Sequence, residues 1–368
     1  MKVAISMMVS PQKKIDRKEL IRDLQSKNHK VVYIGQESGE TLNPDYKDYN
    51  VDFIPIKMGR SNTNPFNEIK SLLDAKKAIK KNNVEVLIAY GIRTFPLMVI
   101  AAKLAGVKKI LCVVNGSGRL FKLNGIRGFL IKLTSYPMLW LAFLFSNSIL
   151  FQNNDDMKMI KRKGLLAKKN YGTINGSGVN LNEFQFTPLE KKPVFLMISR
   201  ITGSKGVNEY INAAIKVKKS YKEAIFYLIG PLDDESGINM PQLQKSVDNG
   251  IIHMLGKIED IKPCISMCRI FVLPSYYPEG VPRSILEAMS MGRPIITTDS
   301  PGCKETVVDG INGFKVPPKN SDLLAEKMEW MIENPNKVEK MGRESRRLAE
   351  MNFDVSKVND IMLKTLNI

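Results

Sequence analysis

Short runs of apolar, mostly β-branched residues alternate with helical patterns of apolar and polar positions along the whole chain. Such runs suit strands that are buried on both faces, and the patterns between them suit crossover helices. Strand, helix and strand in repeated succession predict an α/β protein with doubly wound parallel sheets. The predicted strands are residues 3–6, 31–34, 86–90, 110–114, 148–152, 194–199, 225–230, 251–255, 270–274, 294–298 and 313–316. The clearest predicted helices are residues 16–26, 69–80, 95–104, 207–217 and 321–332.

A polar segment interrupts this alternation near the middle of the chain. Residues 182–193 contain two prolines and no periodicity, and the strand and helix pattern restarts after them. We therefore predict two Rossmann-like domains, residues 1–188 and 189–368. We expect the last helix, about residues 350–368, to pack back on the first domain. Ligands of such sheets bind at the carboxyl ends of the strands, so we expect the substrates in a cleft between the domains.

The charge is concentrated in the first half of the chain. Residues 1–188 hold 30 Lys and Arg against 14 Asp and Glu, a net +16, whereas residues 189–368 have a net +2. An ordinary solvated surface is one interpretation. An anionic partner of the first half is another, because basic residues are interleaved with large apolar ones between positions 119 and 145, a pattern typical of helices in an anionic lipid headgroup region. These basic residues are Arg119, Lys122, Arg127 and Lys132.

Composition argues against several other classes of protein. The longest apolar stretch, residues 136–145, is well short of the ~20 residues that a spanning helix needs. We therefore expect a cytoplasmic protein that associates peripherally with the anionic inner face of the cytoplasmic membrane. The four cysteines are scattered and only two histidines occur, which argues against a disulfide framework and a zinc site. Nucleic acid is not expected as a partner, because no helix-turn-helix, zinc-finger or RNP-like pattern accompanies the charge.

One segment of the second half combines the features of an anion-binding site. The predicted strand 270–274 is followed by a loop that carries Glu279 to a predicted helix starting near Pro282. Proline is tolerated at a first helical position because its missing N–H would have no intrahelical partner there. The free amides and the positive dipole end of a helix bind anions. Glu287 lies one turn beyond Arg283, where its carboxylate can accept hydrogen bonds from the hydroxyls of a ribose.

Glu279 and Glu287, with seven residues between them, resemble the E-x7-E motif of the family 4 retaining glycosyltransferases with the GT-B fold. Ser199-Arg200 and Lys205-Gly206 resemble the Arg and Lys with which that family binds a diphosphate. Residues 228–231, 256–261, 301–305 and 309–314 are similar to further blocks of the family, in the same order and spacing. The resemblance covers most of residues 194–330 and implies two Rossmann-like domains that face a central cleft.

The resemblance also implies a donor site in the second half. Arg200, Lys205 and Glu279 become the catalytic residues: the two cations would neutralise the departing diphosphate, and Glu279 would orient the sugar and stabilise positive charge as it develops. The family implies no metal, and the two cations and a helix N-terminus can supply the charge that a divalent ion supplies elsewhere. The implied donor-binding residues are Arg200, Lys205, Gly230, Lys257, Ile258, Glu279, Gly280, Val281, Pro282, Arg283, Ser284 and Glu287.

The first half resembles bacterial members of the family that build O-antigen, capsule and other lipid-linked oligosaccharides. The similar blocks are residues 60–66, 92–93 and 114–118. They imply a polyprenyl-diphosphate-linked saccharide as the acceptor. The implied acceptor-binding residues are Arg60, Arg93, Asn115 and Gly116.

The sequence departs from the family at two places that concern chemistry. Many members have a histidine near the donor sugar, but here only His29 and His253 occur, in positions that favour structural roles. No catalytic histidine is predicted. Arg269 stands where the family often has an acidic residue, just before the strand that leads to the Glu279 loop.

We expect a retaining hexosyl- or N-acetylhexosaminyltransferase that moves a sugar from UDP to a hydroxyl of a lipid-linked saccharide in the synthesis of bacterial surface polysaccharide. Double displacement would need a second carboxylate about 5 Å across the bond, and only Glu279 is placed near the sugar. This favours front-face departure of the diphosphate. Two alternatives stay open: a sugar-nucleotide epimerase of the same fold, and a non-catalytic basic protein that binds anionic lipid or nucleic acid.

Overall fold

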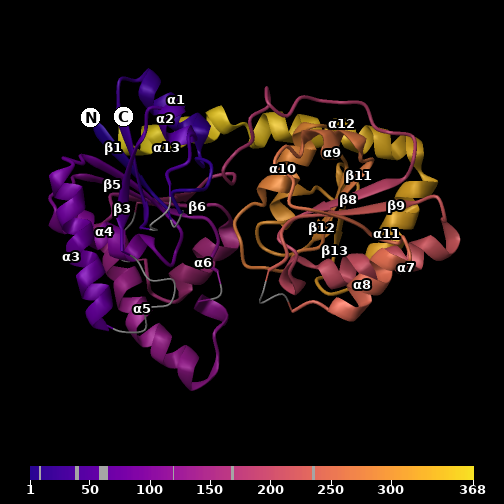
Figure 1. Cartoon of the computed structure of the whole chain (residues 1–368), viewed down its shortest axis with the longest axis horizontal. Helices are drawn as coiled ribbons and strands as arrows, with labels where there is room; N and C mark the ends of the chain where they lie inside the picture. The colour runs from indigo at the N-terminus through magenta and orange to yellow at the C-terminus, as the bar shows by residue number, and fades with distance from the viewer. Residues whose placement is uncertain (8–9, 38–40, 58–64, 119, 167–169, 234–236) are drawn as a thin grey trace. The chain divides into compact units, whose positions relative to one another are not determined.

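The structure of the chain, a computed structural model, describes residues 1–7, 10–37, 41–57, 65–118, 120–166, 170–233 and 237–368. These residues form two compact units. The first unit comprises Met1–Ile174 and Ser356–Ile368, and the second comprises Asn175–Val355. Each unit consists of a parallel sheet with helices on both faces, as predicted (Figure 1).

The sheet of the first unit has the strand order β3-β2-β1-β4-β5-β6-β7. Successive side chains of a strand point to opposite faces, so Val3 and Ala4 of β1 enter different cores. Its strands are β1 (Lys2–Ser6), β2 (Lys30–Gln36), β3 (Asp52–Ile56), β4 (Val86–Tyr90), β5 (Lys109–Val114), β6 (Ser148–Phe151) and β7 (Tyr171–Thr173). The sequence pattern did not predict β3 and β7, the two outermost strands, because edge strands carry a weaker apolar signal.

Helices cover both faces of this sheet (Figure 1). One face is covered by α3 (Pro65–Lys81), α4 (Phe95–Leu104), α5 (Gly125–Phe145), which follows the short η1 (Leu120–Lys122), and α6 (Asn154–Arg162). The other face is covered by α1 (Lys18–Ser26), α2 (Asp45–Asp48) and α13 (Val355–Leu366). The last helix of the chain thus completes the core of the first unit with Val358, Met362, Leu363 and Leu366.

The sheet of the second unit has the strand order β10-β9-β8-β11-β12-β13. The chain proceeds outward from β8 on one side and from β11 on the other, so the order reverses between these two strands. Ligands of doubly wound sheets bind at such a switch point, outside the carboxyl ends of the strands. The strands are β8 (Val194–Ile198), β9 (Ile225–Ile229), β10 (His253–Gly256), β11 (Ile270–Leu273), β12 (Ile295–Thr298) and β13 (Gly313–Val316).

The helices of the second unit fill the connections between its strands. They are α7 (Val207–Ser220), α8 (Met240–Asp248), α9 (Lys262–Met267), α10 (Arg283–Ser290), α11 (Ser321–Glu333) and α12 (Pro335–Asn352), with the short helices η2 (Gly203–Lys205) and η3 (Lys304–Thr306).

The chain passes from the first unit to the second between Ile174 and Asn175, which differs from the predicted boundary at residues 188 and 189. The polar segment is not a free linker, because two arginines of the second unit bind its backbone. Arg293 is fully buried and donates to the carbonyl oxygens of Thr187 and Pro188. Arg346 donates to the carbonyl oxygen of Phe184 at 3.0 Å. Periodicity could not show this packing, because backbone carbonyls and not apolar side chains make the contacts.

The structure also accounts for Arg269. Its guanidinium group donates to the carbonyl oxygen of Glu190 and, at 3.2 Å, to that of Pro335. Burial lowers the pKa of Arg269, and Glu339 opposes this effect. Arg269 therefore ties the segment before β8 to the start of α12, and its role is structural.

Candidate active site

The candidate donor site lies at the carboxyl ends of β8 and β11, which are neighbours in the sheet. The loop after β8 carries Arg200 and ends in η2 with Lys205, and the loop after β11 carries Glu279. Gly206 allows these loops to touch. It has a φ of +81°, and a Cβ there would lie 2.2 Å from the carbonyl oxygen of Pro274. Only glycine fits this position without a backbone shift, and this places Lys205 beside the β11 loop.

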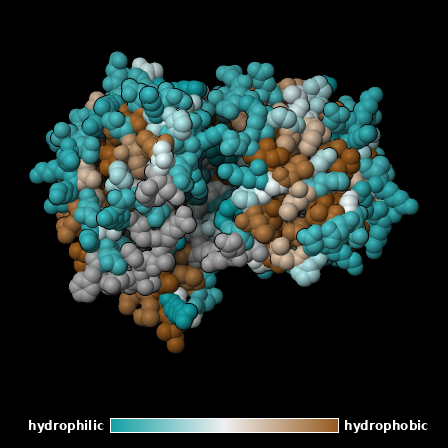
Figure 2. Space-filling model, viewed as in Figure 1, coloured by the Kyte–Doolittle hydropathy of each residue, from teal (hydrophilic) through white to brown (hydrophobic). Residues whose placement is uncertain are grey.

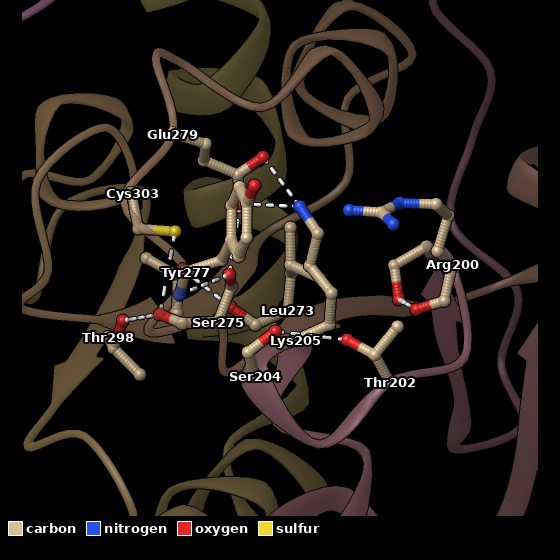
Figure 3. A network of polar contacts seen from close by, with 12 residues as sticks. Arg200, Thr202, Ser204, Lys205, Leu273, Ser275, Tyr277, Glu279, Thr298 and Cys303 are labelled. Carbon is tan, nitrogen blue, oxygen red and sulfur yellow. Dashed lines mark hydrogen bonds and ion pairs between the residues drawn. The ribbon is translucent and has the colours of Figure 1, made fainter. Parts of the chain in front are cut away.

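Lys205 and Glu279 form a close ion pair (Figure 3). The Lys205 Nζ lies 2.6 Å from Glu279 Oε1 and 2.5 Å from Glu279 Oε2, and both side chains are largely buried. The hydroxyl of Ser275 donates to Glu279 Oε1 at 2.9 Å. An ammonium group and a hydroxyl together hold the carboxylate in one orientation and compensate its charge. Glu279 is thus a fixed negative group at the edge of the sheet.

Ser275 is itself held by a buried network that the sequence did not reveal. The residue is fully buried, and its hydroxyl accepts a hydrogen bond from the Tyr277 N–H at 3.3 Å. Its carbonyl oxygen accepts from the hydroxyl of Thr298, with the thiol of Cys303 at 3.9 Å (Figure 3). Burial first, and the Glu279 carboxylate second, raise the pKa of Cys303 to about 12. The thiol therefore stays protonated and does not act as a nucleophile.

The two predicted diphosphate cations face one aromatic ring. The Lys205 Nζ lies 5.5 Å from the centroid of the Tyr277 ring, and the Arg200 guanidinium carbon lies 5.8 Å from it. Both distances are typical of cation–π contacts. Figure 3 shows the guanidinium group pointing toward the side of the site where the Lys205 amine lies. Arg200 also pairs with Asp233, with 2.6 Å between Nη1 and Oδ2.

Glu287 lies in α10, the helix that follows the Glu279 loop. The helix begins at Arg283, and Pro282 is its N-cap residue with an extended backbone. Glu287 is 9% exposed, and its Oε1 lies 3.7 Å from Nη2 of Arg283, as the one-turn spacing predicts. Glu279 instead contacts Lys205 and Ser275. The structure therefore gives the two carboxylates different surroundings within one segment.

The other predicted donor residues occupy the same edge of the sheet but not the same contact network. Gly280, Val281 and Ser284 belong to the loop and first turn that join Glu279 to α10, and Val281 is buried. Gly230 follows β9, and its N–H donates to the carbonyl oxygen of Gly256 at 2.8 Å. Residues 257–258 follow β10, so β9 and β8 separate Lys257 and Ile258 from the Glu279 loop.

In the first unit the predicted acceptor residues lie at the carboxyl ends of two neighbouring strands. Arg93 follows β4, and Asn115 and Gly116 follow β5. Arg93 is close enough to α3 to act on Glu68: burial raises the pKa of Glu68, and the Arg93 charge opposes this. Arg60 lies outside the described residues. The structure thus gathers the described acceptor candidates at one edge of the sheet.

A buried carboxylate that the sequence reading missed supports this edge. Asp156 of α6 donates its N–H to Asn153 Oδ1, and its Oδ2 accepts from Asn153 Nδ2, both at 2.8 Å. Burial raises the pKa of Asp156, and hydrogen bonds from Ser117 oppose this effect. Asp156 therefore ties the loop after β5 to the start of α6. The Asn-x-x-Asp spacing, which resembles a capping box, is the signal that could have identified it.

Both histidines stand at the amino ends of strands, the edge opposite the site residues of their own unit. His29 precedes β2, where burial, and then the positive charges of the N-terminus, Lys27 and Lys109, lower its pKa. His253 begins β10 and is exposed, with its ring 5.4 Å from that of Tyr227. Within the ranges that the structure describes, no group of three His, Cys, Asp or Glu residues is arranged to hold a metal ion.

The two halves of helix α5 differ in burial. Its first half exposes Ile126, Phe129, Leu130 and Leu133, each more than half accessible, whereas Leu139 and Phe143 of its second half are buried. Figure 2 shows hydrophobic side chains gathered where α5 lies in Figure 1, at the bottom of the view. Across the described part of the chain, α5 is the one helix long and apolar enough to cross a membrane, by length and composition only.

Two family models match this chain and together span most of it. The model described as "Glycosyl transferases group 1" matches residues 180–348, and the model described as "Glycosyl transferase 4-like" matches residues 9–153. The first match contains the whole candidate donor site. The second contains the described acceptor candidates Arg93, Asn115 and Gly116.

Two of the curated relatives are named for diphospho-undecaprenol-linked sugars. The chain is 27% identical to the N,N'-diacetylbacillosaminyl-diphospho-undecaprenol α-1,3-N-acetylgalactosaminyltransferase of Campylobacter jejuni, over 86% of both chains. It is 25% identical to the UDP-Gal:α-D-GlcNAc-diphosphoundecaprenol α-1,3-galactosyltransferase of Escherichia coli, over 78% of this chain and 76% of that protein.

Solved structures show the same fold at low sequence identity. A glycosyltransferase from Rickettsia africae superposes with a TM-score of 0.77 at 20% identity, over 100% of this chain and 97% of that one. Alr3699/HepE from Anabaena, solved in complex with UDP, superposes with a TM-score of 0.76 at 16% identity, over 100% and 99%. The same family is indicated by the two matched models, by the two parallel sheets and by the E-x7-E segment. The chain belongs to the family 4 glycosyltransferases and has the GT-B fold.

Proposed function

We propose that this glycosyltransferase moves a hexosyl or N-acetylhexosaminyl group from a UDP-sugar to a hydroxyl of a polyprenyl-diphosphate-linked saccharide, with retention of the anomeric configuration. The observation that carries the proposal is the pairing of Glu279 with Lys205, at a site where Arg200 faces the same aromatic ring. The relatives that act on diphospho-undecaprenol acceptors support the choice of acceptor. They favour a transferase over an epimerase or a non-catalytic protein.

Arg200 and Lys205 receive the diphosphate in this proposal. The bond between the anomeric carbon and the phosphate oxygen breaks, and UDP leaves with the electron pair. Two cations within reach of the departing oxygens stabilise that charge without a bound metal. The Lys205 ammonium has three N–H donors, so it can bind a phosphate oxygen while it still holds Glu279.

Glu279 stabilises the sugar rather than attacking it. Both of its oxygens accept from Lys205 and one also accepts from Ser275, and these contacts fix the position of the carboxylate. A fixed carboxylate suits a sugar that gains positive charge in the transition state. The acceptor hydroxyl then attacks from the face that UDP leaves, and its proton passes to a diphosphate oxygen. The configuration is retained in this way.

The acceptor and the membrane are proposed for the first unit. Arg93 and Asn115 stand where a diphosphate or a sugar of the acceptor could bind, at the carboxyl ends of β4 and β5. The exposed apolar half of α5 carries Arg127 and Lys132 among its large side chains. Such a surface favours the anionic inner face of the cytoplasmic membrane, where a polyprenyl diphosphate is anchored.

A donor screen followed by a transfer assay tests the proposed function. The purified chain is incubated with UDP-, GDP- and dTDP-sugars, and the best donor is then offered with a polyprenyl-diphosphate-linked N-acetylhexosamine. We expect transfer from a UDP-sugar with retained configuration.

In Arg200→Ala and in Lys205→Ala the dissociation constant of UDP should rise at least tenfold, about 1.4 kcal/mol, since charged hydrogen bonds contribute ~1.5–3 kcal/mol. Unchanged UDP affinity in both variants would remove these residues from the donor site.

A further inference from the structure

Asp233 forms an ion pair with Arg200, one of the proposed diphosphate cations. Its Oδ2 lies 2.6 Å from Nη1 of Arg200. The Asp233 side chain is 28% exposed and the Arg200 side chain is 50% exposed. No motif points to Asp233, because it follows β9 and lies 33 positions from its partner. The pair therefore places an acidic residue against a cation that the proposed function assigns to the diphosphate.

The backbone fixes this placement. Beyond the ends of β8 and β9 the two segments stay paired: the Ile201 N–H donates to the carbonyl oxygen of Pro231 at 2.9 Å, and Ile201 and Leu232 form a parallel bridge. Gly230, with a φ of +146°, permits the close approach, since a Cβ there would lie 1.7 Å from the carbonyl oxygen of Ser199. The N–H of Asp233 donates to the carbonyl oxygen of Ile201 at 3.4 Å, so Asp233 lies beside the residue that follows Arg200. Asp233 meets Arg200 because the ladder continues.

The two cations of the site differ in how they are paired. Lys205 is largely buried, and its partner Glu279 is also held by Ser275. Arg200 is half-exposed, so an incoming anion can reach both its guanidinium group and the Asp233 carboxylate. A guanidinium group binds carboxylate and phosphate oxygens through the same planar set of N–H donors. The Asp233 carboxylate occupies Nη1 of Arg200, so a diphosphate that binds the guanidinium group through this nitrogen must replace the carboxylate.

We propose that Asp233 competes with the diphosphate for Arg200 and thereby speeds the release of the nucleoside diphosphate product. The proposal rests on the donor site assigned under the proposed function. When the diphosphate leaves, the carboxylate returns to the guanidinium group, so the cation never has to lose all its charged partners at once. Asp233 lowers product affinity in exchange for faster dissociation.

Asp233→Asn tests the proposal in the full-length chain. We expect the variant to bind UDP at least threefold more tightly by calorimetry and to release it at least threefold more slowly in stopped-flow displacement. In an Arg200→Ala background the same change should alter UDP affinity by less than 1.5-fold, because the carboxylate then has no guanidinium to compete for.

Glu344→Gln serves as the matched control. Glu344 pairs with Arg347 on α12 at 2.7 Å, also as an exposed Arg–carboxylate pair, and its neutralisation changes the net charge of the second unit by the same amount. UDP affinity should not change in this variant. Equal tightening in Glu344→Gln, or in the Arg200→Ala background, would show a general charge effect and would overturn the proposal.

The remaining outcomes are equally decisive. Weaker UDP binding by Asp233→Asn would mean that the carboxylate positions Arg200, and this would overturn competition. Unchanged UDP binding would overturn it as well; if Lys205→Ala still weakened UDP, the proposed function would stand without it. Failure of the unmodified chain to bind UDP, GDP, dTDP or ADP would reject both the donor site and the proposal.

Discussion

Glu279 and Glu287 belong to one sequence motif, but their different contacts predict different losses. Glu279→Gln removes the charge opposite the developing positive sugar, so turnover should fall about 100-fold or more while UDP still binds. Glu287 is predicted from the sequence to accept hydrogen bonds from the ribose, so in Glu287→Gln UDP affinity itself should fall about tenfold. Steady-state kinetics and calorimetry on both variants separate the two effects. Equal loss of UDP binding in both variants, or full activity in both, would contradict the separate roles.

Ser275 should act as a positioning residue for Glu279. Ser275→Ala removes the 2.9 Å hydrogen bond to the carboxylate, so we expect turnover to fall about tenfold at unchanged UDP affinity. Thr298→Val is the matched control, because Thr298 is equally buried in the same network but donates to the Ser275 carbonyl oxygen and not to Glu279.

The two variants are distinguished by comparing the loss of turnover with the loss of thermal stability in each. Both should lower the thermal midpoint, since each removes a buried hydrogen bond. Only Ser275→Ala should lower turnover more than the loss of stability explains. If Thr298→Val lost as much turnover, Ser275 would be a structural residue and nothing more.

At the residue scale the sequence predicted members of the site but not their pairing. Spacing and resemblance identified Arg200, Lys205 and Glu279, because glycine, proline and charge recur at short fixed distances around them. The partners Asp233 and Ser275 were not predicted. Asp233 meets its partner through a ladder between separate strands, and Ser275 is a common residue at a strand end, where no local pattern reveals a hydrogen bond.

At the scale of elements, apolar periodicity predicted the buried strands and missed what is held by other means. The interior strands β1, β4 and β5 are buried throughout or nearly so, and each was predicted within a residue or two. Residues 182–193 were predicted to be the boundary between the domains because they are polar and aperiodic, whereas arginines bind their carbonyl oxygens. Element prediction therefore fails where the backbone supplies the contacts.

Helix α5 is a second element whose packing the sequence pattern did not predict. Its basic and apolar residues predict helices in an anionic lipid headgroup region, but the structure packs Leu139, Ala142 and Phe143 of its second half into the core of the first unit. Pro137 stands between the halves and removes one helical N–H. The sequence alone could not say which half is covered, because that depends on which turns of the helix pack against α4 and the sheet.

At the scale of the whole molecule, the positive charge and the exposed apolar half of α5 belong to the same unit. Residues 1–188 carry +16 and residues 189–368 carry +2. Counted over the two units of the structure, the net charges are +18 and 0, so the charge is not a uniform property of the surface. A chain that merely favours lysine would spread its charge over both halves. The asymmetry is what an anionic membrane facing one unit would select, because each basic side chain near such a surface contributes roughly 1 kcal/mol.

Liposome flotation tests this asymmetry. Replacement of Lys122 and Arg127 by Ser should weaken binding to anionic vesicles about 30-fold, which corresponds to about 2 kcal/mol, and zwitterionic vesicles should recover little of any variant. The control replaces Lys219 and Lys340, two exposed lysines of the second unit, and should float like the unmodified chain.

Phe129→Ser should also weaken binding, since Phe129 is 66% exposed and its burial in lipid is then lost. Salt should weaken flotation of the unmodified chain, because the attraction is screened. All variants should keep UDP affinity, which shows that the second unit is folded. Equal flotation of both double variants, or on both lipid types, would leave the +16 as ordinary surface charge and would favour a soluble acceptor.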